Sequence, residues 1–132
     1  MNENGFQANL VYDELKISGD ESYGFHPCEL LVSSIVGCSG GVFRNILEKM
    51  RLSFNEVTIS AQVERNEAKA NRIETIHLIY SIYADNDNIA PIKIEQALIL
   101  ARKNCSMIQS VQNSITITEE FKMNKTHCPE SE

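Results

Sequence analysis

The stretch PCELLVSSIVGCSGGVFRNILEKM, residues 27–50, decides the fold of this chain. Pro27 suits the first turn of a helix, where its missing N–H is not needed, and Glu29 follows near the positive end of the helix dipole. The first part is apolar nearly all round, which is typical of a buried central helix. Its glycines, each costing about 1 kcal/mol in a helix relative to alanine, leave room for another backbone. The stretch therefore predicts a long core helix over residues 27–50.

The segments on either side of this helix predict strands and a second helix. Alternating apolar and polar residues are typical of half-buried strands, and they occur at residues 6–12, 14–18, 57–63, 73–83 and 114–118. Residues 91–101 predict a helix, and Asn104 is expected to end it and to cap a short helix that starts at Cys105. The order favours an α+β fold with an antiparallel sheet and helices on one side. The two short strands before the long helix would gain partners in a sheet of another subunit.

Composition limits the possible functions. The 132 residues are enough for one domain with a real core, and we expect a single domain over 1–132 with a loose tail from about residue 123. The net charge of −6 argues against a nucleic-acid partner, which needs concentrated Lys and Arg. The apolar stretch at residues 30–47 is interrupted by polar residues and is expected to fall short of a membrane span. The first residues do not resemble a signal peptide, so we expect a cytoplasmic location.

Two of the four cysteines, Cys38 and Cys105, lie in separate apolar segments with helical patterning. If the helices pack side by side, the two thiols could support reversible thiol chemistry; otherwise they are small buried hydrophobes. The chain contains no C-x-x-C motif. An apolar position in the middle of a helix is expected to raise the pKa of Cys38, whereas a helix N-terminus near Arg102 and Lys103 would favour a thiolate at Cys105. The two cysteines could therefore exchange roles.

Other candidate residues have simpler structural explanations. Glu29 suits the first turn of a helix, and a role in orienting Cys38 is the alternative. The pairs His26/Cys28 and His127/Cys128 contain zinc-ligand residue types, but their spacings match no known finger, so neither a metal nor a cofactor is expected. Arg44 is expected at a surface or interface, and His77 is expected to face solvent.

Around the central helix the sequence resembles the family of osmotically inducible protein C and organic hydroperoxide resistance protein. The resemblance rests on Pro27, on Glu29 to Cys38, on Leu47 to Arg51 and on a second helical cysteine, Cys105, and the element order matches over about residues 6–121. It implies an intertwined homodimer that reduces organic hydroperoxides at the subunit interface. Cys38 would attack the peroxide as a thiolate and Cys105 would resolve the sulfenic acid as a disulfide, which a dithiol then reduces.

Two positions depart from the peroxidases of that family. Peroxidase members use an arginine of the N-terminal strands and a glutamate just after the proline to hold the thiolate. Here Lys16 is the only Lys or Arg before Arg44, and Glu29 comes one residue later than the family position. The chain therefore resembles the less characterised branch of the family. Two hypotheses follow: a cysteine peroxidase that uses Cys38, Cys105 and Glu29, or a dimeric protein that binds a small apolar or electrophilic ligand without peroxide turnover.

Overall fold

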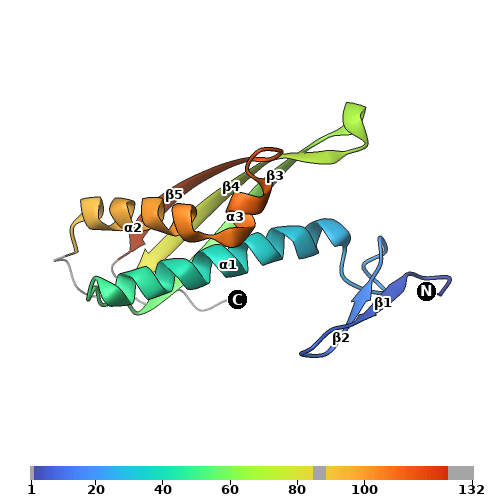
Figure 1. Cartoon of the computed structure of the whole chain (residues 1–132), viewed down its shortest axis with the longest axis horizontal. Coiled ribbons are helices and arrows are strands. Elements are labelled where there is room, and N and C mark those ends of the chain that lie inside the picture. The colour runs from blue at the N-terminus through green and yellow to red at the C-terminus, as the bar shows by residue number, and fades with distance from the viewer. Residues whose placement is uncertain (1, 85–88, 125–132) are drawn as a thin grey trace. The chain divides into compact units, whose positions relative to one another are not determined.

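The computed structural model describes residues 2–84 and 89–124, and it divides into two compact units, Met1–Ser34 and Ile35–Glu132 (Figure 1). The helix α1, Pro27–Lys49, begins in the first unit and ends in the second. The expected helix over 27–50 is therefore confirmed to within one residue. Strands and helices combine in a mixed α+β fold, as expected.

The first unit is built on a small antiparallel hairpin. Its strands are β1, Phe6–Asn9, and β2, Glu14–Ile17, paired from Phe6 opposite Ile17 to Asn9 opposite Glu14. The chain then returns along β2, where Phe25 donates its N–H to the Lys16 carbonyl at 2.8 Å. Gly24 makes this approach possible, because a Cβ there would lie 2.7 Å from the Lys16 oxygen. The hairpin and its return segment lead directly into α1.

A three-stranded sheet forms the frame of the second unit. Its strands are β3, Glu56–Asn66, β4, Arg72–Tyr83, and β5, Thr116–Asn124, in the order β3-β4-β5. The short helix η1, Glu67–Lys69, lies in the turn between β3 and β4. β3 pairs antiparallel with β4, but β5 runs parallel to β4. The expectation of a wholly antiparallel sheet is thus wrong.

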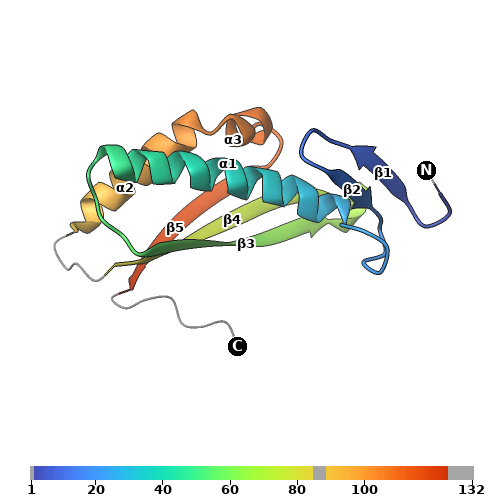
Figure 2. The ribbon, with the colours of Figure 1, turned by 90° about the horizontal axis from the view of Figure 1, so that it is seen from below.

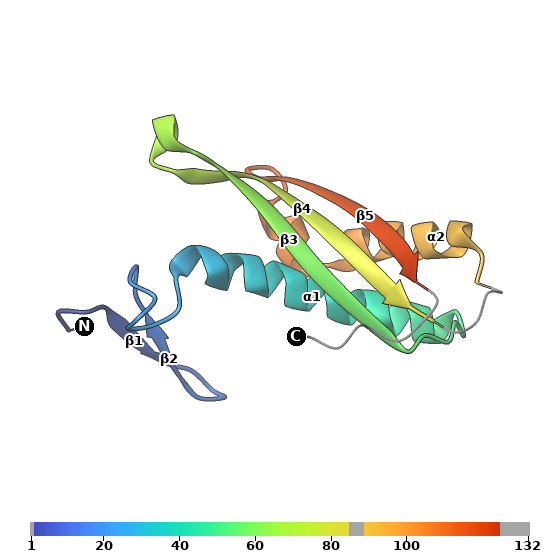
Figure 3. The ribbon, with the colours of Figure 1, turned by 180° about the vertical axis from the view of Figure 1, so that it is seen from behind.

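The parallel pairing follows from the connection between β4 and β5. This connection contains α2, Pro91–Asn104, and α3, Ser106–Val111. The helical crossover returns the chain to the end of the sheet at which β4 begins. β5 therefore runs in the same direction as β4. The helices of the second unit lie on one face of the sheet (Figures 2 and 3), as expected. β5 also continues to Asn124, beyond the predicted end of that strand and into the segment expected to be loose.

The core of the second unit lies between the sheet and these helices. α1 contributes residues spaced by four, Ile35, Ser39, Phe43 and Leu47, and all are buried. β4 contributes alternate residues, Ile76, Leu78, Tyr80 and Ile82, which are fully buried on the face predicted from the sequence. The Phe43 and Tyr80 rings pack edge to face with centroids 5.0 Å apart. Gly40 lies against β3, since a Cβ there would come 2.9 Å from the Cδ1 atom of Ile59.

The apolar character of α1 also bears on a membrane location. By length and composition this helix could cross a membrane, which is contrary to the expectation from the sequence. The core helix of a globular protein can have the same length and the same apolar composition. Four residues of α1 are buried in the core of the second unit, so packing against the sheet accounts for part of its apolar surface.

Candidate functional site

The structure brings Cys38 and Cys105 together. Cys38 lies on α1 and is half-buried, while Cys105 is fully buried between α2 and α3. The two thiols lie close enough that each shifts the pKa of the other. The Sγ atom of Cys38 also lies 3.6 Å from the Oγ atom of Ser106. Thus a partly accessible thiol, a buried thiol and a hydroxyl form one cluster inside the second unit.

The break between α2 and α3 creates this cluster. Cys105 has extended backbone angles, φ −83° and ψ 108°, so α2 ends before it and α3 starts after it. The Cys105 carbonyl accepts the Gln109 N–H at 3.0 Å, which closes the first turn of α3. Asn104 instead ends α2, and its side chain donates to the Leu100 carbonyl at 2.8 Å. The expectation that Asn104 caps the second short helix is therefore wrong, because Cys105 takes that position.

Hydrogen bonds make Cys38 the more acidic thiol. The backbone N–H of Met107, the Ser106 hydroxyl and the Cys105 thiol hold the pKa of Cys38 below its ordinary value, and burial opposes them only in part. Burial raises the pKa of Cys105. Both directions are opposite to those expected from the sequence. The reason is that donors from α3, a distant segment of the chain, reach Cys38, whereas Cys105 is enclosed in the core.

This difference in acidity suits thiol redox chemistry. The thiolate is the nucleophile, and a low pKa together with access to small molecules makes a cysteine reactive. A second thiol in contact can condense with an oxidised cysteine before it is oxidised further. The arrangement therefore favours Cys38 as the attacking thiol and Cys105 as the resolving thiol.

A chain of buried polar side chains lies close to these thiols. The hydroxyls of Ser39 and Tyr80 are hydrogen-bonded, and the Tyr80 hydroxyl is within reach of the Glu119 carboxyl. The Nη1 atom of Arg102 lies 3.8 Å from Oε1 of Glu119 and donates to the Ile117 carbonyl at 2.6 Å. The side chain of Glu119 is only 8% exposed, and burial raises its pKa.

This chain of polar side chains was not predicted from the sequence. One signal was available: Glu119 shares a face of β5 with Ile117, so alternation places a carboxyl among the inward-facing residues. A pocket of about 440 Å³ lies beside it between α2 and β5. Leu98, Ile99 and Phe121 provide apolar walls, and Glu95 adds a second carboxyl.

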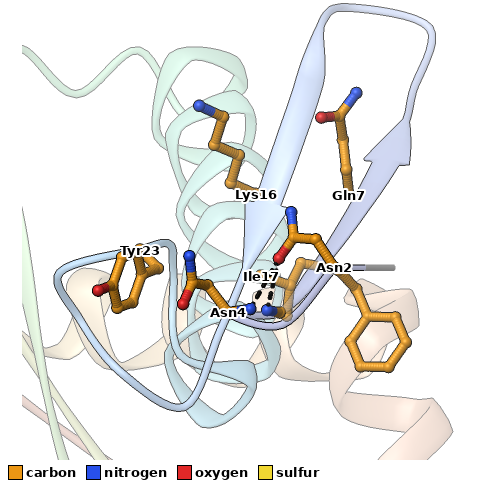
Figure 4. A pocket seen from close by; sticks show the side chains of 8 residues that line it. Asn2, Asn4, Gln7, Lys16, Ile17 and Tyr23 are labelled. Carbon is orange, nitrogen blue, oxygen red and sulfur yellow. Dashed lines mark hydrogen bonds between the residues drawn. The ribbon is translucent and has the colours of Figure 1, made fainter.

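Glu29 lies in the first unit, on the first turn of α1. It is exposed and lines an open pocket of about 690 Å³ together with Lys16 and Tyr23. A smaller pocket of about 170 Å³ near the start of the hairpin also includes Lys16 and Tyr23 (Figure 4). The amide oxygen of Asn2 accepts two backbone hydrogen bonds there, from Asn4 at 2.8 Å and from Gly5 at 3.0 Å. A role for Glu29 at the thiol site stays a prediction.

The histidines that the structure describes take part in local hydrogen bonds. The Nδ1 atom of His26 accepts the N–H of Cys28 at 3.1 Å, at the start of α1. His77 is partly exposed and bridges Thr118 at 2.6 Å and Glu120 at 2.9 Å on β5. Within residues 2–84 and 89–124, the structure groups no three His, Cys, Asp or Glu side chains that could hold a metal ion. The pair His127/Cys128 lies outside the described residues.

These features define a class: a small α+β protein with two thiols in contact, one of them acidified. Residues 19–120 match the model of the OsmC-like protein family, and the chain belongs to this family. No curated protein sequence matches the chain.

Solved structures of this family share the fold. A hypothetical protein from Aquifex aeolicus VF5 is 25% identical and superposes with a TM-score of 0.82. The match covers 94% of this chain and 90% of the Aquifex chain. An organic hydroperoxide resistance protein from Elizabethkingia anophelis is 10% identical with a TM-score of 0.75, covering 94% and 92%. The organic hydroperoxide resistance protein OhrB of Bacillus subtilis is 14% identical with a TM-score of 0.57, covering 75% and 71%.

Proposed function

We propose that this protein is a thiol-dependent peroxidase that reduces organic hydroperoxides in oxidative-stress defence. The observation that carries the proposal is the proximity of Cys38 and Cys105, with the pKa lowered at the accessible thiol and raised at the buried one. Similarity in fold to proteins named for organic hydroperoxide resistance supports it.

The proposed reaction has three balanced steps. The Cys38 thiolate attacks the distal peroxide oxygen, so that an S–O bond forms, the O–O bond breaks, and the alkoxide leaves and takes up a proton. The Cys105 sulfur then attacks the sulfenic acid, forming the disulfide and releasing water. An external dithiol reduces the disulfide by exchange, which returns both thiols and oxidises the dithiol.

We further propose that the protein works as a homodimer with exchanged strands. The hairpin of the first unit has only two four-residue strands, and such a hairpin is marginally stable by itself. Large apolar side chains of this unit are exposed, namely Phe6, Leu10, Val11, Tyr12, Tyr23 and Phe25. A partner sheet would cover them and satisfy the strand edges. Sedimentation velocity tests this, since the mass of a single chain in solution would contradict it.

A second candidate function is a dimeric protein that binds a small apolar or electrophilic ligand without turnover. One observation favours it: the groups that lower the pKa of Cys38 are neutral donors, namely Met107, Ser106 and Cys105. A neutral donor stabilises a thiolate less than a nearby cation does. Ligand binding without consumption of peroxide would therefore support this second function.

The deciding experiment follows the consumption of cumene hydroperoxide with dithiothreitol as reductant. It compares the wild type with Cys38→Ser, Cys105→Ser and the matched control Cys28→Ser. We expect turnover to be lost in Cys38→Ser and kept in Cys28→Ser, while Cys105→Ser becomes inactivated as Cys38 is overoxidised. A folded wild-type protein that consumes no peroxide would exclude the peroxidase and leave the ligand-binding function.

A further inference from the structure

We propose that the hydroxyl of Ser106 is a catalytic group that donates a hydrogen bond to Cys38, first to the thiolate and then to the oxygen of the sulfenic acid. This inference rests on the proposed function, because it names a further residue of the same site. It starts from the 3.6 Å contact between Ser106 Oγ and Cys38 Sγ, which is within hydrogen-bonding distance for sulfur. Ser106 thereby touches the reacting atom directly.

The hydroxyl of Ser106 is available for this contact. Among the residues that the structure describes, Cys38 is the only hydrogen-bond partner of this oxygen. Ser106 is the first residue of α3, and the turn that holds it is closed by the bond from Gln109 N–H to the Cys105 carbonyl at 3.0 Å. The backbone of Ser106 is therefore held in a helical turn, and the side chain needs only to rotate to donate.

The other side-chain donor to Cys38 cannot serve in every step. The Cys105 thiol gives up its proton when it attacks the sulfenic acid, and after that it is bonded to Cys38. The Ser106 hydroxyl is not consumed, and it can donate either to the thiolate before attack or to the oxygen of the sulfenic acid afterwards. It is a neutral group, so it lowers the energy of the thiolate without placing a cation beside an apolar peroxide.

The test uses the pH dependence of Cys38 alkylation by iodoacetamide, followed by mass spectrometry of the Cys38 peptide. The variants are Ser106→Ala, which removes the hydroxyl, and Ser106→Thr, which keeps it. Ser110→Ala is the matched control, because it removes from the same short helix a hydroxyl that donates to the Ser106 carbonyl and not to the Cys38 thiol. Circular dichroism confirms that each variant is folded.

We expect Ser106→Ala to move the alkylation profile to higher pH and to slow alkylation at neutral pH by roughly threefold to tenfold, the loss typical of one hydrogen bond. Ser106→Thr should restore the wild-type profile, and Ser110→Ala should not change it. An unchanged profile in folded Ser106→Ala would overturn the inference. Because alkylation needs no peroxide, this result is separate from a failure of the proposed function, which appears as a wild type without peroxide turnover.

Discussion

The guanidinium of Arg102 reaches only one oxygen of the Glu119 carboxyl, with Nη1 3.8 Å from Oε1. The other oxygen, Oε2, is buried and has no hydrogen-bond partner among the residues that the structure describes. A buried carboxylate that is incompletely paired costs free energy, and protonation relieves this cost. Glu119 therefore couples the stability of the second unit to pH.

The pH dependence should be visible in Glu119→Gln. Burial raises the pKa of Glu119 in the folded state, so the folded protein binds this proton more tightly than the unfolded chain. The stabilising contribution is present below the ordinary carboxyl pKa of about 4.3 and is lost as pH rises through the raised folded value. Urea unfolding across this pH range should show that the free energy of unfolding falls with rising pH in the wild type, and that Glu119→Gln removes this fall. Glu64→Gln, at an exposed site, is the control, and an equal decline in all three proteins would contradict the prediction.

Tyr80→Phe should destabilise the fold. The substitution keeps the ring that packs on Phe43 but removes the hydroxyl that joins Ser39 and Glu119. Leaving buried Ser39 without its partner should lower the free energy of unfolding by about 1–2 kcal/mol. Chemical denaturation measures the change. Tyr83→Phe, on the more exposed face of β4, should have a much smaller effect, and equal losses would count against a special role for the buried chain.

Gly37→Ala tests whether α1 packs only within its own chain. Apart from its chain neighbours and the backbone of its own helix, no described atom lies within 4 Å of a Cβ built at Gly37, whereas one built at Gly40 would approach Ile59 Cδ1 to 2.9 Å. On helix propensity, Gly37→Ala should therefore raise the free energy of unfolding by up to about 1 kcal/mol. Gly40→Ala should gain less, because Ile59 must shift. A clear loss of stability in Gly37→Ala would show that another molecule packs closely on this face.

Mild oxidation should form a disulfide between Cys38 and Cys105. The proximity of the two thiols, each of which shifts the pKa of the other, should allow the bond to form without a large movement of α1 relative to α3. One equivalent of cumene hydroperoxide, followed by a non-reducing digest and mass spectrometry, should reveal the joined peptides. Cys28→Ser should form the same disulfide. Oxidation of Cys38 to sulfinic acid in the wild type, without joined peptides, would exclude Cys105 as the resolving thiol.

Much of the local structure was predictable from the sequence. The helix from Pro27 follows from proline in the first turn and a mainly apolar stretch, and the buried face of β4 follows from apolar residues at every second position from Ile76 to Ile82. Both patterns depend on neighbours in sequence, through backbone geometry and the burial of one face. They also place Cys38 and Cys105 on elements of the core, without saying what surrounds each thiol.

The tertiary structure decided the chemistry of the site and the direction of β5. The sequence predicted Cys105 as the more acidic thiol, but the structure makes Cys38 the more acidic one. The donors that lower the pKa of Cys38, the hydroxyl of Ser106 and the N–H of Met107, come from a segment about 70 residues further along the chain. β5 runs parallel to β4 because of the path of the helical crossover. Pattern in the sequence determines which residues become helix, strand and core; only packing of distant segments determines which donors reach a thiol and which carboxyl is left buried.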